Sequence, residues 1–419
     1  MMGVVDSLMV GKLGAAPLAA ASLGNTLAFI MLIIGIGVSL AVTPLVAIAI
    51  GAKKFEDCGI YFRQSLLVNG IFSILLAVMI FFAAGLIQYF DQPLEIQFQA
   101  ESYMRILGLS SVPLMLFQTY KQFIEGLSVM RPAMIITLTA NIVNVFTNWL
   151  LIFGNWGFPA LGLDGAGWAT FASRVFMALA LMIFVMNNKF FKQYDVSFHF
   201  RSINWRVIKK ILSLGLPSGI QYFFEVGAFS FAVIMVGWLG TIQLAAHQIA
   251  ISLASISFMA VLGISVAGSI RVGNAVGMKD ISETRRAGFT ASFLGASIML
   301  VAGIIFVLFR DFLPTLYISD QEVISYASSL LIIAALFQIS DGIQAVGIGI
   351  LRGLTDVKIP TAITFIAYWI VGLPVGYILG FTYELGVQGV WIGLLLGLTT
   401  SAILLTLRFN SRSKQIVNI

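Results

Sequence analysis

LGLPSGIQYFFEVGAFSFAVIMVGWLG, residues 214–240, decides the fold class of this chain. The stretch can cross a bilayer as a helix, because about 20 apolar residues span the hydrocarbon core of ~30 Å. Pro217 stands near its start, and a single carboxylate, Glu225, stands about halfway along it. A charge at the centre of a membrane helix costs about 2.5–3.5 kcal/mol on insertion scales. The stretch therefore predicts both a membrane span and a functional site.

Composition extends this prediction to the whole chain. Of its 419 residues, 59% are hydrophobic and only 10% are charged, with a mean hydropathy of +0.99. Soluble domains carry about 25% charged residues. The apolar runs are about 20 to 30 residues long, which excludes the ~10-residue alternating strands of an outer-membrane barrel. We therefore predict an all-α polytopic membrane protein.

Residue types that mark other protein classes are scarce. Cys58 is the only cysteine, so a disulfide within the chain is excluded. His199 and His247 stand far apart and in no metal-ligand pattern, which argues against an intramembrane zinc peptidase. The net charge of +6 is not a nucleic-acid footprint, because the basic residues fall in loops on one side. We expect no enzyme activity, no resident cofactor and no nucleic-acid partner.

Hydropathy predicts twelve helices. The first, residues 1–11, is too short to cross a bilayer at 1.5 Å per residue, so we expect its beginning to be missing from this chain. The other expected spans are 19–50, 61–88, 97–126, 132–154, 165–188, 216–238, 241–271, 284–309, 322–351, 359–381 and 387–407. A polar, basic connector, 189–204, divides the chain into an N-lobe, 1–188, and a C-lobe, 205–419, whose first residues, 205–215, are amphipathic.

Basic residues give the expected orientation. Alternate loops hold nearly all of the Lys and Arg residues outside the spans, and the opposite loops hold only Lys12 and Arg310. Because loops rich in Lys and Arg face the cytoplasm, we predict that the connector and the C-terminus are cytoplasmic. The expected location is a bacterial inner membrane.

The two halves repeat each other. MVGKLG at 9–14 matches MVGWLG at 235–240, and the spacing between matched residues stays nearly constant along the chain. Further matches join AIG at 49–51 to AVG at 275–277, GL at 126–127 to GL at 353–354, and LG at 161–162 to LG at 385–386. Each half would contain six helices. Because six is an even number, both halves have the same orientation in the membrane, and an axis along the membrane normal should relate them.

Polar side chains inside the spans are the candidate site residues. Glu225 and Asp341 are the deepest carboxylates. The repeat does not require Asp341, which corresponds to Leu114, or Asp6, which corresponds to Ala232. Asp6 is the only carboxylate of the first helix. Asparagines of one span, Asn141, Asn144 and Asn148, share a helical face. They could equally be interhelical hydrogen-bonding residues or ligands, and Asp341 before Gly342 could be a residue of a helix bend.

Other polar residues have simpler interpretations. Glu101 and Arg105 are expected to form a local ion pair, Glu125 and Arg131 to flank a turn, and His247 to be a packed core residue. Arg174 fits either a partner of some acid or a side chain that reaches toward the interface.

Motifs along the whole chain resemble the multidrug and toxic compound extrusion (MATE) family, in its NorM-like branch. The matching stretches are VDSLMVG at 5–11, EGLS at 125–128 with RP at 131–132, Asn144 to Trp149, Gly162 to Thr170, Leu216-Pro217 with Phe224-Glu225, and Asp341 to Gly353. The resemblance implies a twelve-helix, two-lobed antiporter, monomeric in the bilayer, that exports small organic cations in exchange for Na⁺ or H⁺.

The resemblance also implies roles for residues. Glu225 and Asp341 match the cation-site acids of the second lobe, and they favour Na⁺ as the bound metal ion. Asp6, Asn144, Asn148 and Thr170 match first-lobe positions for proton or substrate coupling. One departure is Phe337, where some NorM-like members are expected to have a tyrosine.

Two alternatives stay open. A lipid-linked oligosaccharide flippase of the same superfamily would need cavity cations for pyrophosphate, and only Lys121 and Arg174 are available. An intramembrane enzyme or a channel is disfavoured, because neither a catalytic dyad nor a filter loop is visible.

Overall fold

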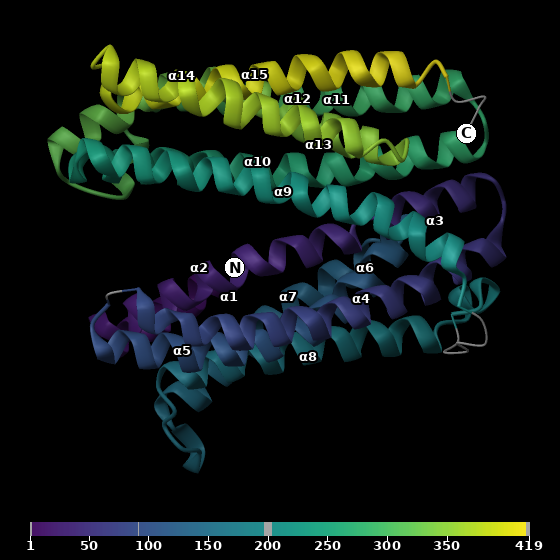
Figure 1. Ribbon diagram of the computed structural model, residues 1–419, viewed down its shortest axis with the longest axis horizontal. Coiled ribbons are helices and arrows are strands. Elements are labelled where there is room, and N and C mark those ends of the chain that lie inside the picture. Colours follow the sequence, from purple (N-terminus) through teal and green to yellow (C-terminus); the bar gives the residue numbers. More distant parts are fainter. Residues whose placement is uncertain (1, 91, 197–202, 416–419) are drawn as a thin grey trace. The chain divides into compact units, whose positions relative to one another are not determined.

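A computed structural model describes residues 2–90, 92–196 and 203–415 of the chain. The described residues form helices and connecting turns without a strand (Figure 1). Within them, 10 helices are long and apolar enough to cross a membrane. The prediction of an all-α polytopic membrane protein is confirmed. Residues 197–202 of the predicted connector, including His199, lie outside the described residues.

By internal contacts the chain divides into two compact units, Met1–Val46 with Lys54–Gly219, and Ala47–Lys53 with Ile220–Ile419. Two helices, α3 (Val42–Gly51) and α9 (Trp205–Leu239), supply residues to both units. The lobe boundaries drawn from the repeat stay a prediction.

The first unit is a bundle in which α4 packs on α5 and α6, and α7 packs on α8 (Figure 1). The bounds of its remaining helices are α1 (Met2–Val10), α2 (Ala15–Ser39), α4 (Phe55–Ala84), α5 (Leu94–Leu109), α6 (Ser111–Gly126), α7 (Arg131–Phe153) and α8 (Leu163–Asn187). Short 3₁₀ segments join them at 11–13, 85–89, 155–157 and 189–194.

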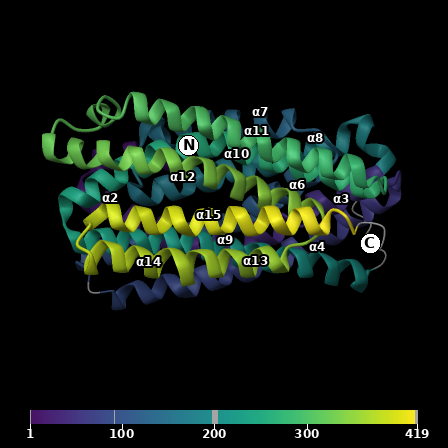
Figure 2. The ribbon, with the colours of Figure 1, turned by 90° about the horizontal axis from the view of Figure 1, so that it is seen from above.

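The second unit is built on α12 (Gln321–Gly353), which packs against α10 (Thr241–Gly277), α11 (Ile281–Leu308) and α15 (Gly386–Arg412). Alongside α15 run α13 (Lys358–Phe365) and α14 (Leu373–Tyr377), as Figure 2 shows. Glycines allow this approach, since a Cβ at Gly393 would collide with the backbone of Gly376. Two π-helical segments, Ile366–Gly372 and Ile378–Thr382, flank α14, and a 3₁₀ segment at 313–316 precedes α12.

Prolines explain where the predicted spans break. A proline ring clashes with the carbonyl four residues earlier and interrupts a helix. Leu109 stands four residues before Pro113, so its carbonyl is the one that the proline ring displaces. The expected span 97–126 is accordingly two helices, α5 and α6, that meet at Ser110. Pro44 similarly separates α2 from α3 after Leu40. The predicted single span was wrong in this respect. With α1 and the α5–α6 pair, the ten long helices make the expected twelve segments.

The backbone carries the internal repeat. Residues in matching positions of the two halves share positive φ angles, which residues other than Gly seldom adopt. The pairs are Gly14 (φ 128°) with Gly240 (121°), Lys53 (56°) with Lys279 (57°), Ser128 (64°) with Thr355 (58°), and Gly162 (56°) with Gly386 (58°). Turns of the same conformation at matched positions are what a duplication of a six-helix unit produces.

Candidate cation and substrate sites

In the first unit, three helices bring Asp6 together with polar partners. Asp6 lies on α1, which packs against α7 and α8. Asn148 of α7 donates from Nδ2 to Asp6 Oδ1 at 2.6 Å, and Thr170 of α8 donates from Oγ1 to Asp6 Oδ2 at 2.9 Å. Asn148 also donates to Asn144 Oδ1 at 3.3 Å. We call Asp6, Asn144, Asn148 and Thr170 the Asp6 cluster.

All four side chains of the Asp6 cluster are buried. Both carboxylate oxygens accept from neutral donors, and Asp6 forms no ion pair with the described residues. Asn144 Nδ2 and Asn148 Oδ1 have no hydrogen-bond partner. A buried polar atom without a partner is uncommon, and the two atoms leave a donor and an acceptor beside the acid.

Two neighbours of the Asp6 cluster have other partners. Asn141 shares its helical face but donates to Thr137 O of its own helix at 2.7 Å. Arg174, one turn beyond Thr170, donates to Ser110 Oγ at 2.6 Å and forms no ion pair with Asp6. Arg174 is therefore held near the cluster by a neutral hydroxyl.

In the second unit, Glu225 of α9 and Asp341 of α12 line one cavity of ≈ 260 Å³. Its walls are largely apolar and include the aromatic rings of Tyr222, Phe229 and Phe337. Both carboxylates belong to the lining of this one cavity. Neither forms an ion pair with the described residues, so the cavity combines negative charge with ring faces that attract cations.

A polar chain holds Glu225 in place. Gln344, one turn after Asp341 on α12, donates from Nε2 to Glu225 Oε1 at 3.3 Å. Tyr368, in the π-helical segment Ile366–Gly372, donates its hydroxyl to Gln344 Oε1 at 2.7 Å. Gln344 and Tyr368 are both fully buried. We call Glu225, Asp341, Gln344 and Tyr368 the Glu225 cluster.

The sequence argument missed Gln344 and Tyr368. The spacing of Gln344 from Asp341 could have identified it, because residues three apart share a helix face. No local signal marks Tyr368, since an aromatic residue in an apolar span usually indicates packing. Phe337, where a tyrosine was expected, contributes a ring to the cavity wall, and the tyrosine hydroxyl of the cluster comes instead from Tyr368.

The predicted span 322–351 places Arg352 in the basic loop that follows, whereas α12 continues through this residue to Gly353. It is the penultimate residue of α12, and its side chain is buried beside a small cavity of ≈ 20 Å³ that Glu225 and Tyr222 also line. Its Nε and Nη2 atoms have no hydrogen-bond partner. Arg352 and Glu225 line this small cavity together but form no ion pair with each other.

The remaining polar residues have structural partners. Glu101 Oε1 lies 2.5 Å from Arg105 Nη2, which confirms the local ion pair. Glu125 pairs with Lys121 at 3.7 Å, close to the turn at Ser128. His247 is buried, and its Nδ1 accepts from Trp391 Nε1 at 3.0 Å, as a packed core histidine would. No group of three or more His, Cys, Asp or Glu side chains that could hold a metal ion occurs in the described part of the chain.

Comparison with known proteins shows which family shares this sequence and architecture. The family model described as MatE matches residues 1–150 and 217–378. A probable multidrug resistance protein NorM of Agrobacterium fabrum is 36% identical over 410 residues, covering 96% of this chain and 88% of the relative. The multidrug resistance protein MdtK of Yersinia pseudotuberculosis is 34% identical over 422 residues, covering 99% and 92%.

A crystal structure of a MATE protein in the bent conformation superposes with a TM-score of 0.92 at 20% identity, covering 100% of this chain and 92% of the other. The helices and the polar clusters inside them thus define a multi-pass membrane transporter. The chain belongs to the MatE family, and its relatives are named as multidrug resistance proteins. The resemblance to NorM-like members is confirmed.

Proposed function

We propose that this protein is an antiporter that exports small organic cations in exchange for Na⁺ or H⁺, with Na⁺ favoured. The observation that carries the proposal is the cavity shared by Glu225 and Asp341. Two carboxylates without a cationic partner attract a cation, and aromatic walls suit an organic one. We infer that the protein lies in a bacterial inner membrane and works as a monomer.

Coupling follows from competition for negative charge. When the Glu225 cluster binds the coupling ion, it releases the drug more readily than it does without the ion. The ion gradient then drives export by shifting the populations of the inward-open and outward-open states. Na⁺ is favoured because two carboxylates supply oxygen ligands, which hard cations prefer. Asp6, Asn144, Asn148 and Thr170 would bind protons or substrate in the other half of the molecule.

The flippase alternative is weaker. A pyrophosphate-linked substrate needs free cations in a cavity, but Lys121 pairs with Glu125, and Arg174 donates to Ser110. Neither residue lies in the cavity of the Glu225 cluster. Arg352, whose Nε and Nη2 atoms have no hydrogen-bond partner among the described residues, lines the adjacent cavity of ≈ 20 Å³, which is too small for such a substrate. These contacts favour cationic over anionic cargo.

The first test is ethidium uptake into inverted membrane vesicles that contain the full chain, with Na⁺ and pH gradients imposed separately. Glu225→Gln and Asp341→Asn should each reduce Na⁺-driven uptake to background at normal protein levels, because each removes a charge that attracts the cation. Glu322→Gln, which removes an exposed carboxylate from the first turn of the same α12, is the control and should transport normally.

Any other outcome would change the proposed cation site or the proposed function. Transport retained in both Glu225→Gln and Asp341→Asn would contradict the proposed cation site. Proton-driven uptake that persists in Glu225→Gln but disappears in Asp6→Asn would move coupling to the Asp6 cluster. Absence of transport under either gradient would favour the flippase.

A further inference from the structure

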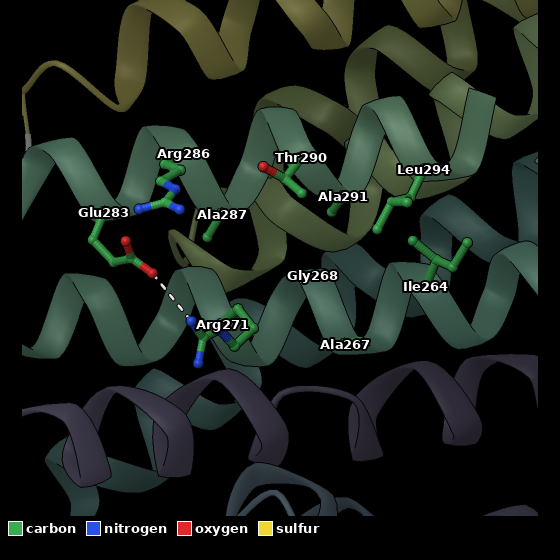
Figure 3. Close-up of a pocket in the computed structure, with 10 residues that line it drawn as sticks. All are labelled: Ile264, Ala267, Gly268, Arg271, Glu283, Arg286, Ala287, Thr290, Ala291 and Leu294. Carbon is green, nitrogen blue, oxygen red and sulfur yellow. Dashed lines mark hydrogen bonds and ion pairs between the residues drawn. The ribbon is translucent and has the colours of Figure 1, made fainter. Parts of the chain in front are cut away.

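A second cavity, of ≈ 440 Å³, lies between α10 and α11 (Figure 3). One end of it, lined by Arg271, Glu283 and Arg286, lies toward the connection of these helices, since α10 ends at Gly277 and α11 begins at Ile281. None of the residues of the Asp6 or Glu225 clusters lines it. We call this cavity the α10–α11 groove.

The mouth of the groove carries an excess of positive charge. Arg271 of α10 pairs with Glu283 of α11, with Nη2 and Oε1 3.1 Å apart. Arg286 is exposed, lines the groove beside this pair, and has no carboxylate within ion-pair distance among the described residues. Its neighbour Arg285 is used elsewhere, donating to Asn410 of α15 and to Ser413 directly after that helix. One guanidinium at the mouth is therefore free for an anion.

The floor of the groove is apolar and made of short side chains. Ala267 and Gly268 of α10 face Ala287 and Ala291 of α11. A Cβ at Gly268 would lie only 3.0 Å from that of Ala291, so the helices are already in close contact beneath the groove. From Arg286 the groove follows α11 to Leu294, eight residues and about 12 Å along the helix. This shape suits an extended hydrocarbon chain.

We propose that the α10–α11 groove binds an anionic phospholipid of the leaflet that meets the basic loops. The phosphate would accept from Arg286, and an acyl chain would lie over Ala287 and Ala291 toward Leu294, which is 48% exposed. Beyond it α11 presents further exposed apolar side chains, including Val301 and Leu308, as a lipid-facing helix does. A free phosphate would use the single guanidinium but not the floor, so the lipid is the ligand that fits the whole groove.

Native mass spectrometry of the full-length protein tests this with phosphatidylglycerol and phosphatidylcholine of identical acyl chains. Wild type should retain more phosphatidylglycerol. Arg286→Gln should weaken that binding by about fivefold, since one basic residue near an anionic surface contributes about 1 kcal/mol. Lys358→Gln removes an exposed charge outside the groove and should change nothing. Ala287→Leu keeps the charges, fills the floor and should also reduce binding.

Three results would overturn the proposal. These are equal retention of both lipids by wild type, equal losses in Arg286→Gln and Lys358→Gln, and unchanged binding in Ala287→Leu. Inorganic phosphate that stabilises the lipid-free protein against heating in wild type but not in Arg286→Gln would assign a free-anion site instead. Lipid binding is read without transport, so failure here leaves the proposed exporter function untouched, and failure of transport leaves this site untouched.

Discussion

At the scale of single residues, both clusters hold an acid with neutral donors, buried at Asp6 and half-buried at Glu225. Asp6 accepts from an amide and a hydroxyl, and Glu225 accepts from Gln344. Neutral dipoles fix the position of a carboxylate without cancelling its charge, whereas an Arg or Lys partner would satisfy the charge within the protein. A charge that is held but not neutralised can attract a mobile cation, and this is the requirement for coupling.

Tyr368→Phe tests the positioning of Glu225. The change removes the 2.7 Å hydrogen bond to Gln344 and leaves a buried amide oxygen without a donor, which costs about 1–3 kcal/mol. We expect a lower melting temperature in detergent and slower Na⁺-driven ethidium uptake. Tyr377→Phe is the matched control, because Tyr377 is exposed and stacks on Phe381 through its ring. Equal behaviour of the two variants would show that the hydroxyl of Tyr368 does not position Glu225.

At the scale of elements, turn geometry sets where helices begin. Gly14 and Gly240 stand directly before α2 and α10 with φ of 128° and 121°. An L side chain is rarely found there, because its Cβ would clash with the backbone. The same requirement explains why the MVGKLG and MVGWLG motifs both end in glycine.

Gly240→Ala should destabilise the protein by about 1–3 kcal/mol through backbone strain alone, since no atom lies within 4 Å of the added Cβ. Gly237→Ala is the control three residues earlier, inside α9 and equally open. It should be neutral or stabilising, because Ala favours a helix over Gly. Melting temperatures in detergent decide the matter, and a Gly240→Ala protein as stable as Gly237→Ala would contradict the backbone argument.

At the scale of the whole molecule, charge distribution predicts the orientation in the membrane. The loops rich in Lys and Arg include the connector, where Lys192 is exposed. On the opposite set of loops, Gln92 is exposed between α4 and α5. Cys58, the only cysteine, is buried, so the unsubstituted chain should not react with a thiol label.

Lys192→Cys and Gln92→Cys therefore form a matched pair for orientation. With a membrane-impermeant maleimide on intact cells, Gln92→Cys should be labelled and Lys192→Cys should react only after lysis, because basic loops stay in the cytoplasm. The opposite pattern would reverse the predicted orientation. Labelling of the unsubstituted protein would mean that Cys58 is accessible and would require its replacement first.

The sequence by itself determined the features that depend on local pattern. Hydropathy located the spans, although α4, α9 and α10 extend by more than a turn beyond the predicted ends. The motifs revealed the duplication, and the cost of a buried charge singled out Glu225, Asp341 and Asp6. It did not resolve α5 from α6, because a proline is common in membrane helices and its effect depends on packing.

Only the tertiary structure decided which residues meet. Asp6 and Thr170, or Glu225 and Gln344, are separated by more than a hundred positions, and such contacts leave no periodic trace in one chain. The burial of Arg352 at the end of α12 and the groove mouth at Arg286 depend in the same way on how neighbouring helices pack. Local hydrophobicity specifies a helix, but the partners of its polar side chains are fixed only when the helices come together.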